Sequence, residues 1–151
     1  MELIKDPFFT IVIPLYNKGK YITRCVDSIL SQSFTSYEVI IIDDGSMDQS
    51  GGIVETIAIE NRDLRIIHQV NGGAFSARRI GLIEGKGKYY LFLDADDCLV
   101  SDSLLMLYQK ANMYPADIII CDIDDIISGD IPKPKKSGIC RKCAYFEFCF
   151  I

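Results

Sequence analysis

The sequence contains no apolar run long enough to cross a bilayer. Its first six residues also lack the basic-then-apolar order of a secretory signal. Of the six cysteines, Cys25, Cys98 and Cys121 stand singly inside predicted helices or strands. That spacing favours reduced, core-type thiols over a disulfide framework. These features together predict a cytoplasmic chain.

The sequence also lacks the common phosphate-binding loops. It has no G-x-x-x-x-G-K-[ST] motif, and neither Gly72-Gly73 nor Gly85-x-Gly87 completes a G-x-G-x-x-G after the first predicted strand. A dinucleotide dehydrogenase is therefore disfavoured. The net charge is −5 and the cations are scattered until the tail, so we expect no nucleic-acid partner. An anionic ligand would need help from a local cation.

Apolar runs and helical periodicities alternate along the chain. Continuous apolar segments predict strands at 9–14, 39–42, 64–67, 89–93 and 118–121. Helices are expected at 20–31, after Ser46 or Asp48, at 75–84, and at 101–113 with Ser101 as the cap. This order predicts an α/β fold with a mainly parallel sheet and helices on both faces.

Carboxylates follow two of the predicted strands. Asp43 and Asp44 end the second strand, and Asp94, Asp96 and Asp97 end the fourth. Ligands of such sheets bind beyond the carboxyl ends of the strands, where we expect acids from neighbouring strands to share a divalent cation. That cation would bridge phosphate oxygens and neutralise charge on a diphosphate leaving group.

Four motifs follow one another in the order typical of a known family. They are Pro14-x-Tyr16-Asn17, Asp43-Asp44-Gly45-Ser46, Asn71-x-Gly73-x-x-x-Ala77-Arg78 and Phe92-Leu93-Asp94-Ala95-Asp96-Asp97. From about Phe9 to Asp122 the chain resembles family 2 glycosyltransferases, which have the Rossmann-like GT-A fold. One departure is Arg79, where the family commonly has Asn.

The resemblance implies a role for each matching residue. Pro14 and Tyr16 would line a nucleobase pocket, Asp44 would accept a hydrogen bond from the base, and Arg78 would hold the base or the phosphates. Asp94 would bind the ribose and Asp96 would ligate Mn²⁺ or Mg²⁺, whereas Asp43 supports its loop. The residues alone leave simpler roles open: Tyr16 as a surface aromatic, Asn17 as a turn former, Arg78 as the partner of a nearby acid and His68 as a structural residue.

The resemblance also implies the reaction. The donor would be a nucleotide-sugar, typically a UDP-sugar, and the acceptor a saccharide or lipid-linked molecule in surface-polysaccharide assembly. Transfer would be an inverting single displacement, with the general base beyond residue 151. We therefore expect this chain alone to bind the donor weakly and to transfer poorly or not at all.

The last residues differ in character from the rest. We place a nucleotide-sugar-binding domain at 1–125, and a linker with the start of a truncated acceptor-side segment at 126–151. Cys140, Cys143 and Cys149 are interpreted as ordinary thiols, because a structural zinc site needs four ligands. The basic residues between 133 and 142 fit a solvated linker or a peripheral contact with the inner face of the membrane. The apolar segment at 144–151 is a candidate homodimer contact.

Two other classes of protein stay open on the residues. In a haloacid-dehalogenase-like phosphotransferase, Asp94 would be the nucleophile and Asp96 the acid/base. Against this, the D-x-D of those enzymes lies on the first strand, and Cys98 replaces their usual Thr or Val. The third class is a non-catalytic binding module that uses the apolar tail as its interface.

Overall fold

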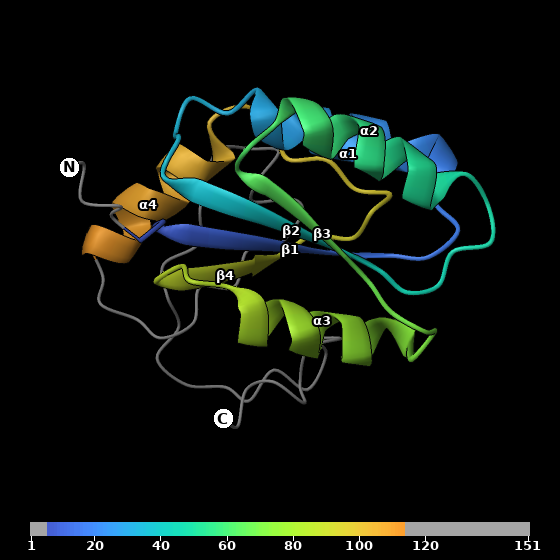
Figure 1. Ribbon diagram of the computed structural model, residues 1–151. Helices are drawn as coiled ribbons and strands as arrows, with labels where there is room; N and C mark the ends of the chain where they lie inside the picture. Colours follow the sequence, from blue (N-terminus) through green and yellow to red (C-terminus); the bar gives the residue numbers. More distant parts are fainter. Residues whose placement is uncertain (1–5, 114–151) are drawn as a thin grey trace. The chain divides into compact units, whose positions relative to one another are not determined.

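The computed structural model describes residues 6–113, in which strands and helices alternate. The elements are β1 (Phe9–Leu15), α1 (Gly19–Leu30), β2 (Tyr37–Asp43), α2 (Ser50–Glu60), β3 (Leu64–His68), α3 (Gly73–Glu84), β4 (Tyr89–Phe92) and α4 (Ser103–Met113). Up to Tyr108, inside α4, they belong to one compact unit (Figure 1). The strand predicted at 118–121 and the segment at 126–151 lie outside the described residues.

The four described strands form one sheet in the order β3-β2-β1-β4. All three pairings are parallel, which confirms the predicted α/β fold with a parallel sheet. One detail of the prediction is wrong: the two acid-bearing strands β2 and β4 are not neighbours, because β1 lies between them. Their carboxyl ends still lie at the same edge of the sheet, which we call the carboxyl edge.

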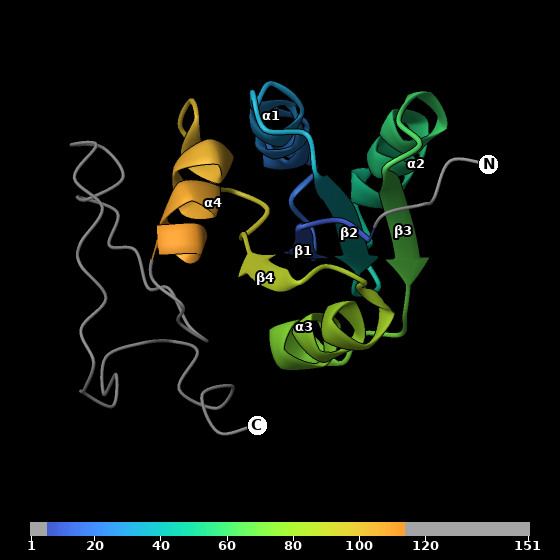
Figure 2. The ribbon, with the colours of Figure 1, turned by 90° about the vertical axis from the view of Figure 1, so that its left-hand side faces the viewer.

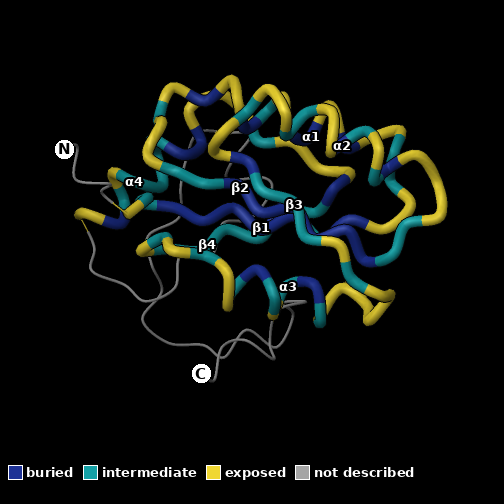
Figure 3. The backbone as a smooth tube through the Cα atoms, in the orientation of Figure 1, coloured by how far each residue is buried: buried dark blue, intermediate teal, exposed yellow. Residues whose placement is uncertain are grey.

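Helices cover both faces of the sheet, with α1 and α2 on one side and α3 on the other (Figures 1 and 2). Alternate residues of the central strands therefore enter different cores. Ile11 and Ile13 of β1 pack with α1, while Val12 packs with Ala77 of α3. Burial on both faces explains why these strands are continuously apolar (Figure 3).

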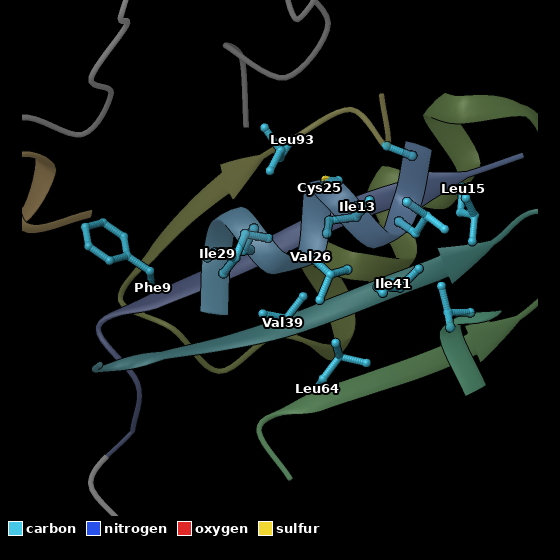
Figure 4. Packing of buried hydrophobic residues seen from close by; sticks show 14 of the residues in the cluster. Phe9, Ile13, Leu15, Cys25, Val26, Ile29, Val39, Ile41, Leu64 and Leu93 are labelled. Carbon is cyan, nitrogen blue, oxygen red and sulfur yellow. The ribbon is translucent and has the colours of Figure 1, made fainter. Parts of the chain in front are cut away.

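Helix α1 packs a fully buried apolar face against the sheet. Its buried residues, Ile22, Cys25, Val26 and Ile29, recur at helical spacing and are fully buried. They lie over Ile13, Val39 and Ile41 (Figure 4). Each buried aliphatic side chain contributes roughly 1.5–3 kcal/mol, so this contact fixes α1 firmly on the sheet.

Two predicted helix starts need correction. Helix α3 begins at Gly73, two residues early, where a glycine takes a left-handed φ of 84°. Helix α4 begins at Ser103 and not after a cap at Ser101. The reason is a turn in which Ser103 Oγ donates to the Val100 carbonyl at 2.7 Å, with Asp102 at a φ of 62°.

The two described cysteines do not behave alike. Both are free, which agrees with the prediction of reduced thiols. Cys25 is buried in the core, and burial raises its thiol pKa to about 12. Cys98 is exposed in the loop after β4, so its assignment as a core thiol was wrong. In the part of the chain that the structure describes, no helix has the length and apolar character needed to span a bilayer.

Glu38 of β2 holds the loop after α3 against the sheet through hydrogen bonds. Its carboxylate accepts hydrogen bonds from Thr10 Oγ1 at 2.7 Å, from Lys86 N at 2.6 Å and from Arg65 Nη2 at 3.1 Å. Burial opposes ionisation of Glu38, but these donors outweigh it and hold its pKa below the ordinary value.

We expect Glu38→Gln to reduce the acid sensitivity of the fold. Because the folded pKa is lowered, the stabilisation is complete above the unfolded value of about 4.5 and is lost as pH falls through the folded pKa. Urea unfolding at pH 7 and at pH 3 measures the effect. Glu60→Gln, at the exposed end of α2, is the control. An equal loss of stability in acid for wild type and Glu38→Gln would contradict the prediction.

Candidate functional site at the carboxyl edge of the sheet

Asp44 follows β2 directly and is almost completely buried, at 3% exposure. Its Oδ1 accepts from Gly72 N at 2.7 Å and from Gln69 Nε2, and its Oδ2 accepts from Gly73 N at 2.8 Å. The carboxylate therefore holds the turn that begins α3. Oδ2 receives one of these donors, and a carboxylate oxygen accepts about two, so it can take one more.

The loops after β1 and β2 are joined by polar side chains. Asn17 has a φ of 51°, and its Oδ1 accepts from Met47 N at 2.8 Å, which agrees with its interpretation as a turn former. Asp48 accepts from Ser50 N at 2.9 Å and from Gly19 N at 3.1 Å. The N-cap of α2 is Gln49, so the cap expected at Ser46 or Asp48 is not at that position, but the exposed Asp48 carboxylate still supports the first residues of both α1 and α2.

Asp43 points to a different set of partners from Asp44. Its Oδ1 accepts from Ser46 N at 3.0 Å, and its Oδ2 lies 2.9 Å from His68 Nδ1. The other ring nitrogen of His68 lies 3.2 Å from Glu55 Oε1. Burial opposes ionisation of Asp43, but the Ser46 and His68 contacts outweigh it and lower its pKa. These contacts agree with the supporting roles expected of Asp43 and His68.

Asp94 and Arg78 form an ion pair at the end of β4. Arg78 Nη2 donates to Asp94 Oδ1 at 2.7 Å, and the arginine side chain is only 14% exposed. Arg78 thereby links α3 to the acidic turn. This is the acid pairing that the sequence left open for Arg78, and nearly half of the Asp94 side chain is still exposed to a ligand.

Asp96 lies two residues further on and pairs with a cation that the sequence analysis did not single out. Lys18 Nζ donates to Asp96 Oδ2 at 2.6 Å, and both side chains are about 40% exposed. This hydrogen bond lowers the pKa of Asp96 and raises that of Lys18. The contact joins the residue after Asn17 to the residue predicted to hold the metal.

The acidic turn formed by residues 94–97 carries a concentrated negative charge. Burial, followed by repulsion from Asp94 and Asp96, raises the pKa of Asp97. Among residues 6–113, no three His, Cys, Asp or Glu side chains are grouped to hold a metal by themselves. One exposed carboxylate such as Asp96 still fits Mg²⁺ or Mn²⁺ as a ligand, with water completing the coordination and the phosphates of a bound donor replacing part of that water.

Helix α1 fixes the segment that follows the acidic turn. Ser28 Oγ accepts from Leu99 N at 2.9 Å. Gln32, which is buried, donates to the Val100 carbonyl at 2.9 Å and accepts from Leu104 N at 3.1 Å. Ser28 lies in the last turns of α1 and Gln32 follows its C-cap, so the end of this helix positions the segment that follows Asp94 and Asp96.

The remaining predicted residues lie on the turn after β1. Pro14 is half-buried within β1, and Tyr16 is 43% exposed. An exposed aromatic ring at the carboxyl edge can stack on a base, although its exposure also suits a surface aromatic. All six predicted residues (Pro14, Tyr16, Asp44, Arg78, Asp94 and Asp96) therefore lie on or next to the carboxyl edge. Arg78, on α3, reaches this edge through its ion pair with Asp94.

Comparison with known proteins agrees with this geometry. Residues 10–149 match the family described as glycosyl transferase family 2. The glycosyltransferase GlyG of Streptococcus pneumoniae serotype 4 is 38% identical over 112 residues, which is 74% of this chain and 37% of that protein. This chain thus spans little more than a third of that curated relative.

Solved structures share the fold. Residues 1–349 of S. aureus TarS in complex with UDP are 31% identical, with a TM-score of 0.68 over 72% of this chain and 33% of that one. The mannosyltransferase PcManGT of Pyrobaculum calidifontis, in complex with GDP-Man and Mn²⁺, has a TM-score of 0.65 over 83% of this chain and 39% of that one. At 21% identity, the latter supports the fold alone. With its GT-A fold and its acids at the carboxyl edge, this chain belongs to glycosyl transferase family 2.

Proposed function

We propose that this chain binds the UDP part of a UDP-sugar at the carboxyl edge, with a divalent cation held by Asp96. The observation that carries the proposal is the acidic turn at 94–97, whose Asp96 carboxylate is 43% exposed. A diphosphate would be repelled by this turn unless a cation lay between them. TarS, a relative with the same fold, has been solved with UDP and with UDP-GlcNAc, which supports UDP as the nucleotide.

Each predicted residue has a role in this proposal. Tyr16 and Pro14 contact the base. Asp44 Oδ2, which already accepts a hydrogen bond from Gly73 N, accepts a second one from an N–H of the base. Asp94 accepts a ribose hydroxyl, and Arg78 holds Asp94 in place through their 2.7 Å contact. These groups orient the donor before reaction, which lowers the barrier to transfer.

The cation has a distinct role. A bound Mn²⁺ or Mg²⁺ supplies Lewis-acid stabilisation of the diphosphate leaving group. Asp96 would hold it, and the acids beside Asp96 would add to the local negative potential. The whole protein would transfer the sugar to a saccharide or lipid-linked acceptor with inversion, using a general base outside the described residues. Its location in the cytoplasm near the inner membrane face remains a prediction.

Two alternative functions are less well supported. A haloacid-dehalogenase-like phosphotransferase would need Asp94 on the first strand, whereas Asp94 follows β4, and membership of family 2 argues against that class. A non-catalytic module using the tail at 144–151 depends on residues outside the described part of the chain. Neither is favoured by a contact in residues 6–113.

Titration calorimetry of UDP and several UDP-sugars tests the proposal. We expect Mn²⁺ to tighten UDP binding, and Asp96→Asn to remove that gain, about tenfold or more in Kd, because one charged ligand bond is worth on the order of 1.4 kcal/mol. Asp27→Asn, an exposed carboxylate of α1, controls for net charge. A Kd for UDP that does not change when Mn²⁺ is added, or that is the same in Asp96→Asn and the wild type, would disprove the role of Asp96.

A further inference from the structure

The backbone at Lys18 is held by two hydrogen bonds to residues at the start of α2. Lys18 N donates to the buried Ser50 Oγ at 2.9 Å, and the next residue, Gly19, donates to Asp48 at 3.1 Å. The start of the lysine side chain is therefore fixed by the beginning of α2. A fixed backbone lowers the entropy cost of holding a long side chain in one contact.

The side chain then reaches across the carboxyl edge to the acidic turn. Lys18 Nζ lies 2.6 Å from Asp96 Oδ2 and 5.8 Å from the centre of the Tyr21 ring. Arg24, also on α1, donates to the Asp96 carbonyl at 3.3 Å. Asp96 is thus held at its side chain by the residue before α1 and at its backbone by a residue of α1.

An ammonium group and a divalent cation cannot use the same carboxylate oxygen at full strength. Both need a close approach to Asp96, and the positive charges repel one another when they share it. The lysine is covalently attached, so it competes at a constant local concentration, whereas the metal competes at the concentration in solution.

We propose that Lys18 is a built-in competitor for the divalent cation at Asp96, so that the metal must displace its ammonium group to bind. The role of Lys18 is then to set the metal concentration at which the donor site becomes competent. This inference rests on the proposed function, because it assumes that Asp96 ligates the metal.

Mn²⁺ binding to the 151-residue chain without nucleotide tests the inference, with free Mn²⁺ followed by electron paramagnetic resonance. Leaving out UDP prevents any contact between Lys18 and phosphate from masking the competition. We expect Lys18→Gln to tighten Mn²⁺ binding about three- to fivefold, the range for an exposed ion pair near a second cation. Lys18→Arg keeps the charge and should bind Mn²⁺ like the wild type.

Lys20→Gln is the matched control. Lys20 is an exposed lysine of α1, two positions after Lys18, so its loss changes net charge equally without touching Asp96. It should alter Mn²⁺ affinity less than about twofold, because exposed charges farther apart are screened by salt. Thermal unfolding of each variant confirms that the fold is intact.

The outcomes separate the two proposals. Equal Mn²⁺ affinity in Lys18→Gln and Lys20→Gln, or weaker binding in Lys18→Gln, overturns the competitor role while leaving Asp96 as the ligand. Mn²⁺ affinity that is the same in wild type and Asp96→Asn overturns the metal site itself, and with it this inference. Tighter binding in Lys18→Gln that disappears in Lys18→Gln/Asp96→Asn supports both.

Discussion

Asp44→Ala is expected to lower the free energy of unfolding by about 3–4 kcal/mol, because it removes a buried charged acceptor from several donors. Gly72 N and Gly73 N both donate to this carboxylate, at 2.7 and 2.8 Å, and Gln69 does so as well. With Asp44 only 3% exposed, water cannot easily replace the lost acceptor. Urea unfolding monitored by circular dichroism measures the loss.

Asp48→Ala provides the comparison. Asp48 also accepts backbone hydrogen bonds, from Ser50 N and Gly19 N, but it is exposed, so water can replace the lost acceptor and its removal should lower the free energy of unfolding much less than Asp44→Ala does. If Asp44→Ala cost no more than Asp48→Ala, the turn at 69–73 would not depend on the Asp44 carboxylate. The same variant should also lose UDP affinity, because the turn at the start of α3 would no longer be held beside the site.

The position of Asp44 could be predicted from the sequence, but its contacts could not. Its position after an apolar run placed it at the carboxyl edge, and the parallel sheet bears this out. The burial of Asp44 and its hydrogen bonds to Gly72 and Gly73 depend on the path of the loop after β3, which passes beside the end of β2. No local sequence pattern predicts that path. The sequence predicts where a strand-end side chain emerges but not which loop closes over it.

The contact made by Lys18 was also not predictable from the local sequence. It follows Asn17 in a motif that the sequence analysis singled out, yet a lysine at the start of a helix is usually solvated, so nothing local marked it. Its contact with Asp96 spans 78 residues. It exists because β1 lies beside β4, a strand order that the alternation of elements does not fix. The same strand order places β1 between the two acid-bearing strands, which the sequence analysis treated as neighbours.

The strands themselves were predictable for a physical reason. A strand buried on both faces must be apolar at every position, and β1 and β2 meet that condition almost throughout. Helix starts were less predictable, because α3 begins at a glycine with a left-handed φ and α4 begins after a turn closed by Ser103. Such starts depend on single dihedral angles and not on periodicity.

Gly81→Ala is expected to destabilise the fold by about 2–3 kcal/mol, although alanine is the better helix former, because overpacking of a rigid core outweighs helix propensity. A Cβ at this position of α3 would lie 2.2 Å from Val12 Cγ1 and 2.7 Å from Val12 Cγ2. Val12 is fully buried on the central strand, and its branched side chain has little rotamer freedom. The helix must therefore move away from the sheet, and urea unfolding measures the cost.

Gly52→Ala is the matched control, since it makes the same change in a helix of the same unit. A Cβ at Gly52 in α2 meets nothing within 4 Å, so the substitution should stabilise the protein by about 0.5–1 kcal/mol. Val12→Ala in the Gly81→Ala background should recover part of the loss, giving a double mutant less destabilised than the sum of the single changes. Equal effects of Gly81→Ala and Gly52→Ala, or strict additivity with Val12→Ala, would show that α3 does not need a glycine to approach β1. Because Arg78 extends from the same helix to Asp94, the displacement of α3 in Gly81→Ala should also weaken UDP binding, whereas Gly52→Ala should leave it unchanged.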